Sequence, residues 1–134
     1  MKRELFRFYS LLITLCIASG ILAQNRIYYV SPDGTGDGSS WNSTTNLTAA
    51  LGNAKAGDEI WLKGFEQITE AGQLYTAPAE GFTVKSGVKL YGGFEGNEKN
   101  IDERKTLGKP YQLRYRSILS GDINNVSSMN YKYL

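Results

Sequence analysis

The chain contains no histidine, and Cys16 is its only cysteine. A Ser-His-Asp triad and a Cys-His pair are therefore excluded, because both need an imidazole as general base. A zinc site built from histidine and cysteine is excluded on the same ground, and a single cysteine cannot form a disulfide within the chain. Small secreted domains often depend on disulfides because their hydrophobic cores are thin. This chain has to gain its stability from stacking, from length or from a partner.

The first 23 residues have the order of a secretory signal peptide. Lys2, Arg3 and Arg7 make a positive start, residues 11–17 form an apolar stretch, and small residues lead up to Ala23. A membrane span needs about 20 apolar residues, so this stretch is too short for one. The pattern predicts export and cleavage after Ala23.

This leader predicts a secreted or extracellular protein, or one at the outer-membrane surface. Cys16 is a candidate for lipidation, but Leu15 precedes it where a lipoprotein signal has Gly, Ala or Ser, which argues against a lipoprotein. We therefore expect residues 1–23 to be the signal peptide and residues 24–134 to form one domain. We expect no membrane span once the leader has been removed.

The charge of the remaining chain is balanced. Of the 15 basic and 13 acidic side chains, three and one, respectively, lie in the leader, so residues 24–134 are formally neutral. A neutral domain lacks the basic footprint of a nucleic-acid-binding protein, and we expect no nucleic acid among its partners. The basic cluster in the C-terminal half is interpreted as a solvated loop face (Lys105, Lys109, Arg114 and Arg116).

Short apolar segments recur with a spacing of about 30 residues. They are residues 60–62, 88–90 and 118–119, and each has a glycine close by. A repeat of that length is typical of a solenoid, in which one coil cannot bury its apolar side without a neighbour. We expect these segments to be three stacked rungs.

A short amphipathic helix is predicted just ahead of the first rung. Apolar residues recur at helical spacing between Leu47 and Ala54. Asn46 suits the N-cap, Lys55 falls in the last turn, and Gly57 suits a left-handed stop. Such a helix can cover the open N-terminal end of a solenoid.

The other elements are predicted from β propensity and turn residues. Residues 26–30 and 82–84 are predicted as strands, and residues 64–81 as a long loop. Residues 92–93, a Gly-Gly pair, are expected to break the second rung. No predicted helix follows the third rung, so we expect the C-terminal end of the stack to be open.

Five stretches of this sequence occur together in one kind of secreted protein: residues 29–41, 47–50, 56–62, 88–94 and 118–123. They resemble the N-terminal portion of right-handed parallel β-helix proteins of the pectin-lyase-like superfamily, closest to the polymorphic outer-membrane or adhesin-like type. The resemblance implies a mostly β fold, the start of a right-handed parallel β-helix with about three rungs and a short N-terminal capping α-helix. The superfamily includes lyases, hydrolases and adhesins, so the likeness informs the fold and leaves the activity open.

The main functional hypothesis is a non-catalytic, secreted or surface β-helix domain of adhesin-like or structural type. Proteins of this kind continue for many coils, so we expect an N-terminal fragment of a longer protein. Two alternatives stay open: a fragment of a polysaccharide lyase or glycoside hydrolase whose catalytic coils are missing, and a small glycan-binding module. We predict no catalytic residue, cofactor or metal site. Expected partners are surface glycans or cell-envelope components, and the open C-terminal rung favours self-association.

The acidic residues are candidates for calcium binding and for acid–base chemistry. Asp33 and Asp37 lie in a glycine-rich loop, but Thr44 stands where an EF-hand-type loop needs its bidentate Glu. We interpret this loop as a turn held by its Asp side chains. The carboxylate pairs at residues 58–59 and 102–103 are interpreted as solvated surface, the first because strand neighbours face opposite ways.

Five aromatic side chains are candidates for stacking on sugar rings: Trp41, Trp61, Tyr75, Tyr91 and Phe94. Core or loop packing is the favoured interpretation of the set. Trp61 is expected to face away from the core side of its rung and to be covered by the connection that follows it. Trp41, in the glycine-rich loop, is the one candidate for glycan contact.

Overall fold

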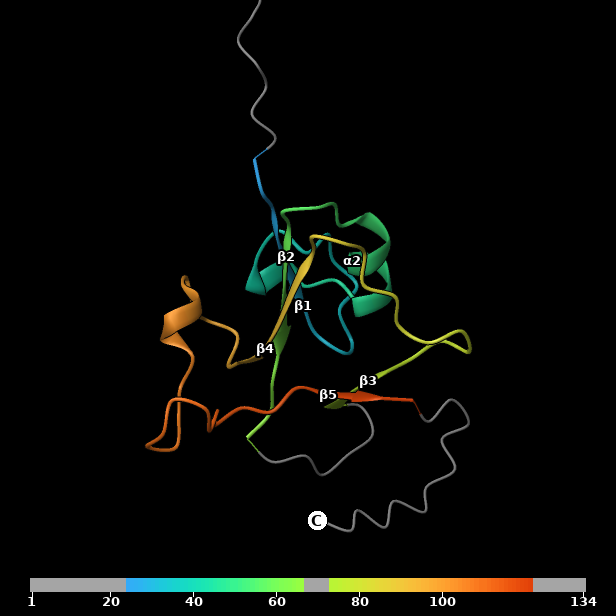
Figure 1. Cartoon of the computed structure of the whole chain (residues 1–134). Helices are drawn as coiled ribbons and strands as arrows, with labels where there is room; N and C mark the ends of the chain where they lie inside the picture. Colours follow the sequence, from blue (N-terminus) through green and yellow to red (C-terminus); the bar gives the residue numbers. More distant parts are fainter. Residues whose placement is uncertain (1–23, 67–72, 122–134) are drawn as a thin grey trace, which may run out of the picture.

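The computed structural model describes residues 24–66 and 73–121 (Figure 1). The predicted signal peptide, residues 1–23, lies outside the described residues. Short strands dominate, and the elements follow in the order β1 (Ile27–Val30), η1 (Trp41–Ser43), α2 (Leu47–Asn53), β2 (Glu59–Lys63), β3 (Leu74–Thr76), β4 (Lys89–Phe94), η3 (Ile101–Glu103) and β5 (Ile118–Ser120). No helix in the described ranges has the length and apolar character needed to cross a membrane.

The strands form two small parallel sheets. One has three strands in the order β1-β2-β4, and the other pairs β3 with β5. Ile27 is paired with Glu59, and Glu59 with Lys89, so each step across the larger sheet advances the chain by about 30 residues. The spacing seen in the sequence is therefore the spacing of the strand register. A mostly β class with parallel sheets and little helix is confirmed.

The three predicted rungs do not form one stack. Residues 60–62 and 88–90 lie mainly in β2 and β4, which are neighbours, but residues 118–119 lie in β5, which pairs with β3. The first strand of the larger sheet is β1 instead. β3 lies within residues 64–81, which were predicted as a loop. The prediction missed it because a strand of three residues, with Leu74 and Tyr75 both buried, is too short to show an alternating pattern.

α2 begins where the sequence predicts and ends sooner. The Asn46 side chain accepts a hydrogen bond from the amide of Ala49, at 2.9 Å, and so caps the helix. The helix ends at Asn53, so Lys55 lies outside it. The prediction that Gly57 ends the helix is wrong: its positive φ of 96° serves the turn before β2.

The end of α2 is capped from a distant segment. The Lys85 ammonium donates to the carbonyl oxygens of Gly52, at 2.5 Å, and Ala54, at 3.2 Å. A cation at this position also interacts favourably with the helix dipole. Residues 82–84, predicted as a strand, are irregular; Phe82 instead packs against the core beside this cap.

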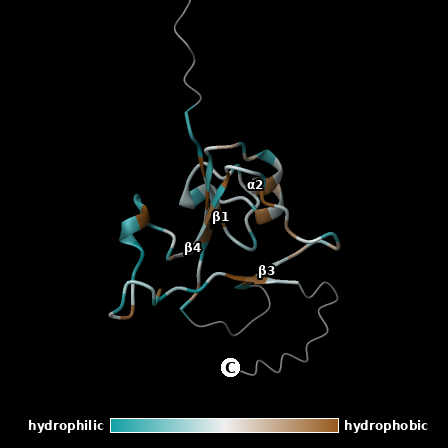
Figure 2. Ribbon diagram, in the orientation of Figure 1, coloured by the Kyte–Doolittle hydropathy of each residue, from teal (hydrophilic) through white to brown (hydrophobic). Residues whose placement is uncertain are grey.

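The main core lies between α2 and one face of the larger sheet. Figure 2 shows hydrophobic residues on α2 and along β1, and Figure 1 shows α2 and η3 on opposite sides of that sheet. Alternate residues of β1 and β2 point toward α2, as the strand period requires. The buried cluster consists of Tyr28, Val30, Leu47, Ala50, Leu51, Ala54, Ile60, Leu62 and Tyr75.

The other face of the larger sheet is also covered, and a bulge in β4 contributes to this. Trp61 is level with Tyr91, whereas Lys63 is level with Phe94, so β4 holds one extra residue. The Gly-Gly pair that was predicted to break the strand forms the bulge, with a φ of 89° at Gly93. The strand therefore continues, and Phe94 is fully buried.

Tyr75 ties β3 to the larger sheet. Its hydroxyl donates to the carbonyl oxygens of Lys63, at 2.7 Å, and Val30, at 3.0 Å, which end β2 and β1. Burial raises the pKa of the Tyr75 hydroxyl, so it stays protonated and keeps its role as donor.

Replacing Tyr75 with Phe keeps the ring and removes the hydroxyl that donates to the carbonyl oxygens of Lys63 and Val30. We expect the free energy of unfolding to fall by about 1–2 kcal/mol, measured by urea denaturation. Tyr111→Phe is the matched control, because Tyr111 is 74% exposed. Its effect should stay below about 0.5 kcal/mol. Equal losses for the two variants would contradict the role given to the Tyr75 hydroxyl.

Candidate functional site

Trp41, the predicted glycan contact, is held by other parts of the protein. It begins η1 and is half-buried. Its ring lies edge-on to Tyr29, with centroids 4.9 Å apart, and tilted against Phe94, at 5.5 Å. Its indole N–H donates to the carbonyl oxygen of Glu98, at 2.9 Å. Much of the indole surface is therefore engaged within the protein, and the glycan contact stays a prediction.

Trp41 belongs to an aromatic cluster on the face of the sheet opposite α2. Phe94 stacks on Trp61 with centroids 4.5 Å apart and planes 9° from parallel, and Tyr29 meets Trp61 edge-on at 5.7 Å. The indole N–H of Trp61 donates to a Glu59 carboxylate oxygen at 3.0 Å. Trp61 is 2% exposed, which confirms that it is packed. The rings on it come from neighbouring strands, whereas the following connection was expected to cover it.

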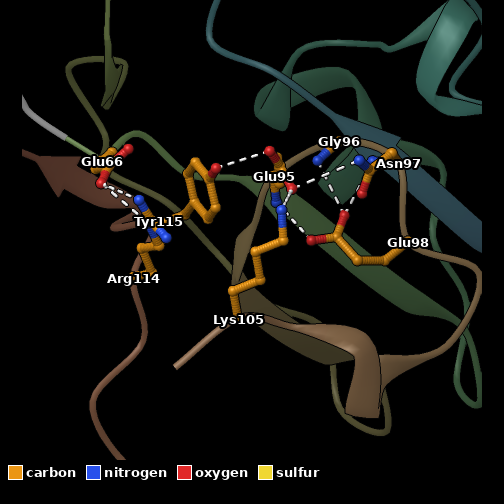
Figure 3. Close-up of polar contacts among 8 residues, drawn as sticks. All are labelled: Glu66, Glu95, Gly96, Asn97, Glu98, Lys105, Arg114 and Tyr115. Atoms are coloured by element: carbon orange, nitrogen blue, oxygen red, sulfur yellow. Dashed lines mark hydrogen bonds and ion pairs between the residues drawn. The ribbon is translucent and has the colours of Figure 1, made fainter. Parts of the chain in front are cut away.

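Glu98 anchors the loop after β4 to this cluster (Figure 3). Its carboxylate accepts hydrogen bonds from the amides of Glu95, Gly96 and Asn97, at 2.6, 2.9 and 3.0 Å. The side chain is buried, and a buried carboxylate needs such donors to offset its lost hydration. Because its carbonyl also binds Trp41, Glu98 fixes the position of the indole.

Two members of the predicted basic cluster are paired with acidic residues (Figure 3). Lys105 forms an ion pair with Glu95, which also accepts a hydrogen bond from the hydroxyl of Tyr115 at 2.7 Å. The Lys105 contact and then the Tyr115 contact lower the pKa of the Glu95 carboxyl. Arg114 pairs with Glu66 at 2.8 Å. These pairs are exposed, so they contribute little to stability and serve to position the connection before β5.

A groove of about 670 Å³ lies at the outer edge of β4. We call it the far-edge groove. It is lined from β4, from the connection that follows η3 and from the start of β5, and its lining includes Leu90, Tyr91, Gly92, Arg104, Tyr111 and Arg116. Exposed apolar side chains occur in the same part of the chain, with Leu107 62% and Leu119 43% exposed. The groove was not anticipated, because its residues are spread over three separate stretches.

The Asp37 side chain holds the glycine-rich loop in a turn, as interpreted for this residue, whereas no bond of this kind is seen for Asp33 among the described residues. Asp37 accepts hydrogen bonds from the amide and hydroxyl of Ser39, at 3.0 and 2.7 Å, and from the hydroxyl of Ser43, at 2.9 Å. The hydroxyl and amide of Ser39, followed by Ser43, lower the pKa of Asp37 to about 2. Within the described residues, no three His, Cys, Asp or Glu side chains are grouped to hold a metal ion.

The interpretation of Asp58 as solvated surface is wrong. Asp58 is buried, and its two carboxylate oxygens accept hydrogen bonds from the amides of Arg26 and Lys55, both at 2.9 Å. These two bonds lower the pKa of Asp58, with Arg26 the larger cause. Asp58 therefore joins the start of β1 to the turn before β2. Its neighbour Glu59 is partly exposed and pairs with Lys89 at 3.6 Å.

The second carboxylate pair, residues 102–103, is exposed on η3, as interpreted. Glu103 accepts hydrogen bonds from the Lys99 amide, at 2.8 Å, and from the Asn100 side chain, at 3.0 Å, and these bonds lower the pKa of its carboxyl. It holds the short helix rather than facing another carboxylate across a cleft.

No protein-family model, no curated protein and no solved structure matches this chain. The function has to be argued from the residues and their arrangement.

Glu98→Gln replaces one carboxylate oxygen with an NH₂ group that faces amide donors. We expect the free energy of unfolding to fall by about 1–3 kcal/mol, measured by urea denaturation. Glu80→Gln is the matched control, since Glu80 is exposed on the connection before β4. Retention of full stability by Glu98→Gln would show that the three amides do not depend on the charged side chain.

Asp58 gives the protein an acid-sensitive contact. A carboxyl whose pKa is lowered on folding stabilises the folded state above its unfolded pKa of about 4, and this contribution is lost as the pH falls through the folded pKa. The free energy of unfolding, measured between pH 7 and pH 2, should fall less steeply below pH 4 for Asp58→Asn than for the natural protein. Asp102→Asn, on exposed η3, should keep the natural slope. Identical slopes for all three proteins would contradict the assignment.

Proposed function

We propose that this chain is a secreted, non-catalytic domain of adhesin-like type, built as the start of a right-handed parallel β-helix. The observation that carries the proposal is the register of the larger sheet, in which Ile27, Glu59 and Lys89 lie level on three successive parallel strands. Parallel neighbours require long crossover connections, and such connections are right-handed in nearly all proteins.

The order of the strands supports a coiled path. β3 follows β2 and β5 follows β4, and these second strands also pair in parallel, with Leu74 level with Ile118. In a β-helix each coil adds one strand to each sheet, and the pairs β2–β3 and β4–β5 are consistent with two such coils. The position of α2 against β1 and β2 supports its role as a lid at the N-terminal end.

The buried and hydrogen-bonded carboxylates support a structural rather than a catalytic role. Asp58 and Glu98 accept bonds from backbone amides, and Asp37 accepts an amide and two hydroxyls. Acidic groups used in this way hold loops in place, and these bonds lower the pKa of Asp58 and of Asp37. A general acid in sugar chemistry needs instead a raised pKa beside a cleft.

Expression of the full chain in a Gram-negative host tests the location. We expect a processed protein that begins at Gln24 and is found at the cell surface or in the medium, identified by N-terminal sequencing of cell fractions. Leu12→Arg breaks the apolar stretch of the leader and should block export, whereas Leu12→Ile should not. An uncleaved cytoplasmic protein from the natural sequence would overturn the proposal.

The same exported protein tests the absence of catalysis. Incubated with a panel of plant-type and host-type polysaccharides, it should release neither reducing ends nor unsaturated sugars. Release of either product would overturn the non-catalytic assignment while leaving the export result intact.

A further inference from the structure

β4 presents unpaired backbone groups on its outer side. Its partner within the described residues is β2, and the Lys89 amide donates to the carbonyl of Asp58, so Lys89 faces β2. Because the backbone groups of a strand alternate in direction, those of Leu90 and Gly92 point away from β2. The Gly92 carbonyl accepts a hydrogen bond from Arg104 at 3.0 Å. Within residues 24–66 and 73–121, no backbone group pairs with the N–H or the C=O of Leu90 on this outer side.

The open backbone faces the far-edge groove. Leu90 and Gly92 line this groove of about 670 Å³ together with aromatic and aliphatic side chains. Tyr111, 74% exposed, stands at the same groove. An edge strand beside apolar pockets is the arrangement used to bind an extended peptide, in which the main chain supplies affinity and alternate side chains supply specificity.

The two charged side chains in the lining of the groove, Arg104 and Arg116, are both basic. From Arg104 to Gly121 the sequence has five basic side chains and no acidic one. Two of them are neutralised by the acidic partners described above. Arg104 lies over the rings of Tyr91 and Phe94, at 5.9 and 5.4 Å, and no ion pair of the described residues includes Arg104 or Arg116. Both of these arginines line the groove.

We propose that β4 remains the edge strand of the larger sheet, at the place where a β-helix would add its next coil, and that the far-edge groove beside it binds an acidic extended peptide segment of a partner protein, which adds as a strand. Acidic side chains of the peptide pair with Arg104 and Arg116, and alternate apolar side chains enter the groove beside Leu90 and Tyr111. Charge complementarity decides the occupant. A second copy of this chain would place uncompensated arginines against arginines, which opposes self-association through this face.

A pair of N-methylated peptides tests the backbone pairing. The probe is the fluorescent peptide Glu-Val-Asp-Val-Glu-Val-Asp, and binding to the exported, processed protein is measured by fluorescence anisotropy. A strand uses alternate amides for each edge, so methylation of one alternate set should weaken binding at least about tenfold and methylation of the other set should leave it within about twofold. The Lys-Val-Lys-Val-Lys-Val-Lys peptide should not bind.

Charge variants of the protein test the groove. Arg116→Glu should weaken the peptide at least about tenfold, because it places a negative charge at an exposed, unpaired position. Lys99→Glu makes the same change outside the groove lining and should stay within about twofold. Tyr111→Ser, at an exposed side chain, should weaken binding without changing the thermal unfolding midpoint.

Four outcomes would overturn the proposal. The first two are that the acidic peptide does not bind and that the two methylated peptides bind equally, since either result would mean that no strand is added. The third is that heparin, an anionic polysaccharide, binds in an Arg116-dependent way while the peptide does not, which would make the groove a glycan site. The fourth is that sedimentation shows a dimer that Arg116→Glu dissociates, which would make a second copy the occupant.

Discussion

The parallel pairing of β1, β2 and β4 is the constraint on which the rest of this structure depends. Neighbouring parallel strands cannot be joined by a tight hairpin and need a long crossover. Here about 30 residues separate level positions on neighbouring strands. A parallel sheet also has to be covered on both faces. The core under α2 covers one face, and the aromatic cluster around Trp61 covers the other.

The long crossover connections contain backbone amides that need hydrogen-bond acceptors, and acidic side chains supply these acceptors. Irregular connections leave backbone amides without partners, and buried amides without partners are costly. Asp58 binds two such amides at the start of the sheet, and Glu98 binds three beyond β4. With no disulfide available within the chain, these carboxylates and the Tyr75 hydroxyl hold its long connections in place. Because these carboxylates already bind backbone amides, they are poor candidates for acid–base chemistry on a substrate.

The sequence predicts the structure well where a pattern repeats along the chain, and poorly where a single tertiary contact determines the local structure. The spacing of the strands, the Asn46 cap and the position of β2 follow from periodicity and local chemistry. β3 has too few residues to show a period, and nothing local indicates that β5 pairs with β3 rather than β4. The glycine pair in β4 was compatible with a break or a bulge, and the stacking of Phe94 on Trp61 favours the bulge. The far-edge groove depends on how β4 and the later connections pack in three dimensions, so the sequence alone could not predict it.

The outer edge of β4 combines protection with access. Natural sheets guard their edges against self-pairing with bulges and inward or flanking charges. Here the bulge at Gly93 shortens the regular hydrogen-bond ladder, and the Arg104 side chain donates a hydrogen bond to the Gly92 carbonyl oxygen. Arg104 and Arg116 also repel another copy of the same edge, since both copies would carry the same positive charge. They do not repel an acidic strand, because the charge that prevents self-pairing attracts it. One set of residues can thus keep the edge free of its own kind and select a partner of opposite charge.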